Sequence, residues 1–301
     1  MELFGWLKII TLGIVEGITE WLPISSTGHL ILVGNVLDPG MSSAFMEMFN
    51  VVIQLGAILA VVVLYFNRLW PFHTKKNMPV KSWFANPVDQ GAAGKFQAFA
   101  NRYLHMDKVV MWLKIAVSCI PAIVIGLPLD DWLEEHMHRP VPVAAMLIIY
   151  GVLFLVIENY NKGRKPRITR LSQITWMDAL IIGGFQVLAI IPGTSRSGAT
   201  IIGGILIGMS RTAAAEYTFY LAIPTMLGAS LMKLVKFGLH FTAIEASVLI
   251  VGMVIAFAVS ILAIKFLMSY IKRHDFKVFG WYRIALGAVV LAVALTGVLK
   301  G

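Results

Sequence analysis

The chain has 301 residues, of which 58% are hydrophobic and only 14% are charged, and its formal net charge is +9. Because a soluble domain has about 25% charged residues, this composition excludes an ordinary soluble protein. The basic residues fall mostly between apolar runs, which favours a topological origin of the charge over nucleic-acid binding. A single cysteine, Cys119, excludes an intrachain disulfide.

Six apolar windows are long enough to cross a bilayer, since a spanning helix needs roughly 20 mostly apolar residues. The apolar runs recur from one end of the chain to the other, so we expect a single membrane domain over residues 1–301. The windows cover residues 45–66, 109–129, 141–158, 213–236, 243–267 and 280–299.

Charged residues between the windows predict the orientation. Segments 67–108, 159–175 and 268–279 are rich in Lys and Arg and are expected on the cytoplasmic side, whereas the acidic segment 130–140 is expected outside. In the long cytoplasmic loop 67–108, the helical spacing of its aromatic residues fits an amphipathic helix at the membrane interface. A cytoplasmic loop without regular order fits that segment equally well.

Two further apolar stretches are interrupted by polar residues and do not fit simple spans. Residues 3–37 are broken at 23–29 by Pro-Ile-Ser-Ser-Thr-Gly-His, and residues 176–208 are broken at 192–198 by Pro-Gly-Thr-Ser-Arg-Ser-Gly. Each interruption combines helix breakers with small hydroxyl residues. We expect two re-entrant helix hairpins, the first entering from outside and the second from inside.

The two hairpins resemble each other. A shift of 170 residues places Glu16 on Gln186 and Ser25 on Ser195. Weak internal symmetry with opposite entry sides is typical of an inverted-topology repeat, in which broken helices meet near the midplane and form the binding site. The expected fold is an all-α polytopic membrane protein with six transmembrane helices and two re-entrant hairpins. Its repeats would cover about 1–158 and about 176–301.

Two acidic residues mark the first hairpin. Glu16 and Glu20 are four residues apart, so a helix places them on one face. Two carboxylates inside the membrane are costly and need a divalent cation, a cationic side chain or a shared proton. Hard oxygen ligands favour Mg²⁺ or Ca²⁺ as the cation.

Hydroxyl residues and a histidine follow the two glutamates. Ser25, Ser26 and Thr27 could be a plain helix N-cap, but a helix N-terminus at this depth is also an anion site. His29 is a candidate acid, base or nucleophile if it lies within reach of the carboxylates and serines, although a lone histidine is more often structural.

The second hairpin supplies a positive charge. Arg196 is flanked by Ser195 and Ser197, and Thr200 follows one turn later. A guanidinium binds phosphate oxygens in a bidentate fork. The alternative is that Arg196 only pairs with Glu16 or Glu20, and both roles can hold at once. Carboxylates, hydroxyls, a histidine and an arginine around one buried volume suit phosphoryl transfer.

These motifs resemble those of the undecaprenyl pyrophosphate phosphatases of the bacitracin-resistance type. The resemblance rests on Glu-x-x-x-Glu at 16–20, Pro-Ile-Ser-Ser-Thr-Gly-His-Leu at 23–30, Val-Ile-Gln-Leu-Gly-Ala at 52–57 and Pro-Gly-Thr-Ser-Arg-Ser-Gly-Ala-Thr at 192–200. It implies a bacterial inner-membrane enzyme that hydrolyses undecaprenyl pyrophosphate to the monophosphate and recycles the carrier of peptidoglycan precursors. It also implies a site open to the outer face.

The resemblance implies roles for individual residues. Glu16 and Glu20 would bind the metal or transfer protons, Ser26 and His29 would lie near the nucleophilic step, and Arg196 would hold the pyrophosphate. Either Ser26 or His29 could attack phosphorus. The expected partners are the lipid substrate and membrane lipid, with a homodimer as the candidate assembly and no nucleic acid. The substrate-binding set is Ser25, Thr27, Ser195, Arg196, Ser197 and Thr200.

Two other functions fit part of the pattern. A lipid-phosphate transporter or flippase would use the same inverted-repeat pocket, but a carrier needs no nucleophile beside a proton donor. A purely structural scaffold does not account for so many polar groups at membrane depth.

Overall fold

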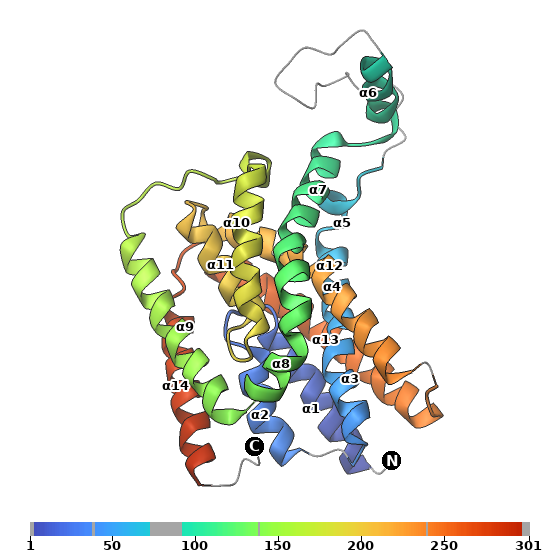
Figure 1. The fold of residues 1–301 in the computed structure, drawn as a ribbon, viewed down its shortest axis with the longest axis vertical. Coiled ribbons are helices and arrows are strands. Elements are labelled where there is room, and N and C mark those ends of the chain that lie inside the picture. Colours follow the sequence, from blue (N-terminus) through green and yellow to red (C-terminus); the bar gives the residue numbers. More distant parts are fainter. Residues whose placement is uncertain (1–2, 38–39, 73–91, 138, 239, 297–301) are drawn as a thin grey trace.

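A computed structural model describes residues 3–37, 40–72, 92–137, 139–238 and 240–296. Within these residues every regular element is a helix. The helices form one bundle, apart from the helix over Ala92–Tyr103, which stands above it (Figure 1). Residues 73–91 of the predicted cytoplasmic loop and residues 297–299 of the last predicted window lie outside the described residues.

Six helical stretches in the described part of the chain are long and apolar enough to cross a membrane. Each overlaps one predicted window, so the prediction of six long apolar helices is confirmed. They are α3 with α4 (Ser43–Val52 and Gln54–Leu64), α7 with a π-helical turn (Met106–Pro121 and Ala122–Gly126), α9 (Pro140–Tyr160), α12 (Arg211–Phe237), α13 (Ala243–Tyr270) and α14 (Lys277–Leu295).

Capping residues set where two of the longest spans begin. The Ser210 hydroxyl accepts from the backbone N–H of Ala213 at the start of α12. A reciprocal capping box joins Thr242 and Glu245 at the start of α13. These side chains satisfy backbone donors that the first helical turn leaves unpaired.

Two pairs of shorter helices lie within the bundle. The first pair is α1 (Leu3–Thr19) and α2 (Ser26–Val36), and the second is α10 (Trp176–Val187) and α11 (Arg196–Leu206). A 3-10 turn, Leu188–Ile190, extends α10. The first pair occupies the lower part of Figure 1 and the second the upper part, and the loop of each turns back inside the bundle.

Close packing at glycines fixes the helix pairs. Gly17 of α1 packs against α13, and Gly183 of α10 packs against the backbone of α7. At the crossing of α9 with α14, a Cβ on Gly151 would lie 2.7 Å from the carbonyl oxygen of Gly280. Small residues allow such close approach of helices in a membrane, where lipid gives little hydrophobic drive for association.

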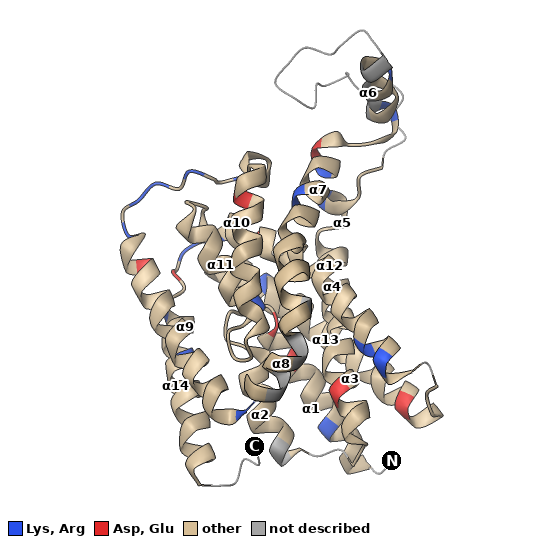
Figure 2. Ribbon diagram, in the orientation of Figure 1, with Lys and Arg blue, Asp and Glu red and all other residues tan. Residues whose placement is uncertain are grey.

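The remaining helices lie at the ends of the spans. They are α5 (Phe66–Leu69), α6 (Ala92–Tyr103), the 3-10 helix Leu171–Gln173 and α8 (Leu127–Met137). A helix therefore does form in the predicted cytoplasmic loop, as α6, with Phe96 and Phe99 each 63% exposed. Figure 2 shows Lys and Arg along the connection between α9 and α10, another predicted cytoplasmic segment.

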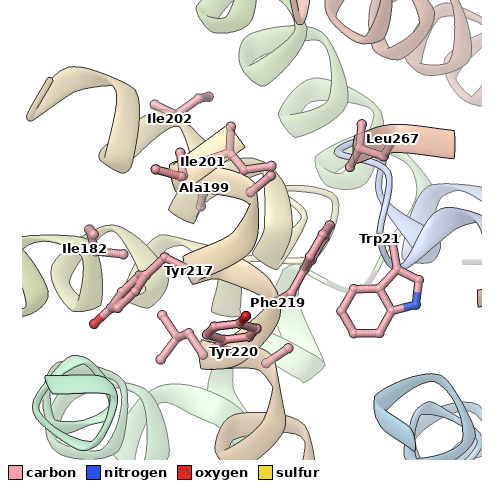
Figure 3. Packing of buried hydrophobic residues seen from close by; sticks show 14 of the residues in the cluster. Trp21, Ile182, Ala199, Ile201, Ile202, Tyr217, Phe219, Tyr220 and Leu267 are labelled. Carbon is pink, nitrogen blue, oxygen red and sulfur yellow. The ribbon is translucent and has the colours of Figure 1, made fainter. Parts of the chain in front are cut away.

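Aromatic packing joins the loop of the first pair to α12. Trp21 is fully buried and meets Phe219 edge-to-face, with ring centroids 5.4 Å apart (Figure 3). Tyr65 contacts Phe219 and Tyr220 from the end of α4. This layer holds the loop after α1 in the centre of the bundle, beside the loop after α10.

Candidate active site

The two inner loops end in the same unusual helix cap. Ser25 and Ser195 have positive φ, 71° and 69°, and each hydroxyl accepts from the backbone N–H of a glycine three residues later, Gly28 or Gly198. Non-glycine residues rarely adopt this left-handed conformation, which costs roughly 1–2 kcal/mol. Strain of this kind persists where the surroundings enforce it, and it gathers at functional sites.

Glu20 links the two loops. One carboxylate oxygen accepts from Nη2 of Arg196 at 2.9 Å, and the other accepts from the Ser26 hydroxyl at 3.2 Å. The side chains of Arg196 and Glu20 are only 13% and 9% exposed. Of the two pairings open from the sequence, Arg196 adopts the one with Glu20. A buried ion pair is costly to desolvate, so its presence here marks a site that needs these charges.

Serine and threonine hydroxyls surround the pair. Ser197 donates to the carbonyl of Glu20 at 3.2 Å and lies 3.1 Å from the Ser195 hydroxyl. Thr200 donates to the carbonyl of Arg196 at 2.9 Å. The structure thus gathers most of the predicted substrate-binding hydroxyls around Arg196.

Helix α12 supports Arg196 from the other side. The Thr218 carbonyl accepts from Nη1 of Arg196 at 3.1 Å, and the Thr218 hydroxyl lies 2.9 Å from that of Thr200. Nε of Arg196 is buried and has no hydrogen-bond partner within the described residues. One donor of the guanidinium is therefore unused in this arrangement. Thr218 was not predicted from the sequence, where it lies in an apolar window with no motif.

Glu16 lies one helical turn before Glu20 and is fully buried. The Gln54 side chain of α4 lies beside it, but neither carboxylate oxygen of Glu16 accepts a well-formed hydrogen bond within the described residues. A buried carboxylate with so few donors around it is strongly destabilising. This side chain therefore calls for a bound cation, a proton or water.

His29 is oriented toward α14. Its Nδ1 lies 2.7 Å from the carbonyl of Ser25, and its Nε2 lies 2.7 Å from the hydroxyl of Tyr282. The two rings are stacked, with centroids 5.6 Å apart. Both ring nitrogens of His29 thus have partners other than the Glu20 carboxylate. Thr27, another predicted site residue, is half-buried in the first turn of α2.

Arg283 of α14 is a further site residue that the sequence reasoning did not select. It is fully buried, and it donates to carbonyls of both loops, those of Pro23, Gly193 and Thr194. The signal was present, because an arginine inside an apolar span marks function by the same rule that singled out Arg196.

A separate pocket of about 440 Å³ lies near the predicted cytoplasmic end of α12. Its lining includes Arg68, Arg170, Glu216 and Tyr220, and none of the predicted site residues. Arg68 and Glu216 form an ion pair at 2.6 Å there. The chemistry-bearing side chains instead meet at the junction of the loops, where Arg196 and Glu20 form their ion pair.

Comparison with known proteins places this combination of fold and site in one family. The model of the bacitracin resistance protein BacA family matches residues 9–289. An undecaprenyl-diphosphatase of Enterococcus faecalis is 57% identical over 287 residues, which cover 95% of this chain and 96% of that protein. Undecaprenyl-diphosphatase 1 of Clostridium acetobutylicum is 56% identical over 296 residues, covering 98% and 99% of the two chains. The undecaprenyl-diphosphatase of Desulfitobacterium hafniense is 57% identical over 292 residues, covering 97% and 96%. The chain therefore belongs to the bacitracin resistance protein BacA family.

Proposed function

We propose that this membrane protein is an undecaprenyl-diphosphatase, a hydrolase that converts undecaprenyl pyrophosphate to the monophosphate and inorganic phosphate. Relatives that carry this name align over nearly the whole chain at more than half identity. The observation that carries the proposal is the Glu20 carboxylate, which contacts Arg196 with one oxygen and Ser26 with the other.

Arg196 is the proposed grip on the pyrophosphate. Its pairing with Glu20 holds the guanidinium in place before substrate binds, and Nε remains available as a donor. A phosphate oxygen can replace the Glu20 oxygen that accepts from Nη2, because a guanidinium binds carboxylate and phosphate oxygens alike. The freed carboxylate is then beside the Ser26 hydroxyl, where it can accept a proton.

Ser26 is the nucleophile that this arrangement favours. Its oxygen would form a bond to the terminal phosphorus while the bond from that phosphorus to the bridging oxygen breaks, and Glu20 would take the hydroxyl proton. Water then hydrolyses the phosphoserine. Lipid monophosphate leaves in the first step and inorganic phosphate in the second. Attack by His29 is the alternative, and it requires the imidazole to leave Tyr282.

Glu16 and Glu20 are the residues that would hold Mg²⁺ or Ca²⁺. The buried carboxylate oxygens of Glu16 fit a hard cation, and Glu20 follows one turn later, with its backbone N–H bonded to the Glu16 carbonyl. Within the described residues no three His, Cys, Asp or Glu side chains form a metal cluster. A cation held by one or two carboxylates, with substrate phosphate and water completing the shell, is the usual arrangement for Mg²⁺. When bound, the cation would neutralise charge on the phosphate oxygens.

We infer that the two inner helix pairs are re-entrant hairpins of an inverted repeat. The matching caps at Ser25 and Ser195 support this inference. So does the packing, because α1 lies against α13 as α10 lies against α7, and α9 lies against α14. With the basic segments inside, the first hairpin opens to the outer face of a bacterial inner membrane. Hydrolysis on that face would return the carrier of peptidoglycan precursors.

Phosphate release from undecaprenyl pyrophosphate tests the proposal directly. The purified protein in detergent is assayed with Mg²⁺, with Ca²⁺ and with chelator, beside Arg196→Ala and the exposed control Arg102→Ala. We expect metal-dependent release that Arg196→Ala lowers by about 10²–10³-fold, as for the loss of one charge-stabilising donor, and that the control leaves unchanged. A folded protein that binds the lipid without releasing phosphate would refute hydrolysis and favour the lipid-phosphate transporter or flippase.

A further inference from the structure

Arg283 carries a charge in the interior of the bundle without a carboxylate partner. Its side chain is fully buried, and its hydrogen-bond partners in the described structure are the carbonyls of Pro23, Gly193 and Thr194, at 3.3, 2.8 and 2.9 Å. The guanidinium also lies over the Tyr150 ring, 5.5 Å from its centroid. An arginine at this depth is expensive, so we look for a function.

The three carbonyls come from both site loops. Pro23 lies between Glu20 and the Ser25 cap of α2, and Gly193 and Thr194 directly precede the Ser195 cap of α11. One planar guanidinium on α14 therefore joins two loops that are far apart in sequence. A lysine ammonium is a compact point charge on a flexible stem and cannot reproduce this fork.

The same part of α14 touches the start of both inner helices. Tyr282, the preceding residue, contacts His29 of α2. A Cβ added at Gly198 of α11 would lie 3.2 Å from Nη1 of Arg283. Arg283 thus lies directly behind the two helix N-termini, and a shift of its guanidinium changes the spacing of the loops in front.

We propose that Arg283 is a positioning residue for the hydrolysis, which clamps the two loops so that Ser26 and Glu20 face Arg196 at reacting distance. This inference rests on the proposed function. Arg283 contacts neither of the reacting side chains in the described structure, so it acts through the loop backbones. Misplacement of reacting groups by about 1 Å can cost about 10²-fold in rate.

Arg283→Lys is the first test, because it keeps the charge and removes the fork. Arg211→Lys is the matched control, since Arg211 is also paired inside the protein, to Glu158 with an Nε to Oε1 distance of 2.9 Å, but away from the site. At a temperature well below unfolding, we expect Arg283→Lys to lower kcat about 10²-fold with little change in KM. The control should lower the unfolding temperature and leave kcat near wild type.

Trp21 can report the position of the first loop. Its signal should not change if Arg283 contributes only to overall stability. Trp21 lies in the first loop, and Arg196 lies 5.9 Å from its ring centroid. With 5-fluorotryptophan incorporated, the ¹⁹F resonance assigned by Trp21→Phe should shift in folded Arg283→Lys and stay in place in Arg211→Lys. Normal kcat and an unmoved resonance in Arg283→Lys would overturn the proposal, as would an equal kcat loss in the control.

A second variant covers failure of Arg283→Lys to fold. Gly198→Ala keeps every charge but crowds the guanidinium, and Gly184→Ala of α10, where a Cβ meets open space, is its control. A fall in kcat of about tenfold in Gly198→Ala alone supports the clamp, and wild-type kcat in both refutes it. If Arg283→Lys is normal while Arg196→Ala is inactive, only the clamp fails. If Arg196→Ala is fully active, the proposed site and the clamp fall together.

Discussion

The two inner loops share a backbone device and differ in chemistry. Both enter a helix through a serine with positive φ, Ser25 or Ser195, and both present small hydroxyl residues behind it. The first loop begins with Glu20, one turn after Glu16 of α1, whereas the second is followed by Arg196. The acidic and basic halves of the site thus come from separate elements, and they meet only because the bundle brings the loops together.

The corresponding positions 16 and 186 sharpen this contrast. Glu16 and Gln186 are both buried, and the polar side-chain atoms of both lack hydrogen-bond partners in the described structure. Only Glu16 can carry a charge. In the proposed repeat, the first pair of inner helices would hold the cation and the second would remain neutral at this position. Each of the following predictions separates the two pairs.

The largest effect is expected from the serines. Ser26→Ala removes the proposed nucleophile beside Glu20, so kcat should fall on the order of 10⁴-fold or more. Ser197→Ala, its matched control in the second loop, removes a hydrogen bond worth about 1 kcal/mol and should cost about tenfold at most. Single-turnover assays with ³²P-labelled lipid should trap phosphoserine in the wild type. If His29→Ala abolishes turnover and Ser26→Ala does not, the histidine is the nucleophile.

The pair that joins the loops comes next. Glu20→Gln keeps the shape and removes the charge, so we expect a loss in kcat of about 10²–10³-fold. Glu20→Gln combined with Arg196→Gln should lose less than the product of the single losses, because residues that act as a unit are not additive. Steady-state kinetics of the full double-mutant cycle measure this coupling. Strict additivity would mean that the two loops contribute independently.

Glu16→Gln makes the first helix resemble the second at this position. If Glu16 is a metal ligand, the Mg²⁺ concentration for half-maximal activity should rise by at least about 10- to 100-fold. Mutation of a residue that only supports a metal ligand already lowers metal affinity by that factor. Gln186→Ala should leave that concentration unchanged. The measurement is a metal titration of activity after chelation. An unchanged requirement in Glu16→Gln would remove Glu16 from the metal site.

The smallest effect tests the shared caps. Ser25→Ala and Ser195→Ala each remove a cap acceptor and keep the positive φ, so each should lower the free energy of unfolding by about 1 kcal/mol. Glycine at either position relieves strain of roughly 1–2 kcal/mol and should be at least as stable as serine. Thermal unfolding in detergent compares the four variants. A large cost of glycine in one loop alone would show that the caps are not equivalent.

The amino-acid sequence by itself determined the six spans and the two polar interruptions. A bilayer requires long apolar helices, and it permits irregular polar backbone only where protein or water can satisfy it. The same rule selected Glu16, Glu20 and Arg196 as candidate functional residues, because charge at that depth is costly wherever it lies.

Only the tertiary structure decided which groups meet. The sequence left Arg196 free to pair with either glutamate, and the bundle brings it to Glu20. It placed His29 near the serines, whereas the imidazole binds Tyr282 from α14. The sequence reasoning did not select Arg283, and its three carbonyl partners come from loops distant in sequence. Hydrophobic periodicity reports which face of a helix is buried, but the contacts between buried faces depend on how the helices pack.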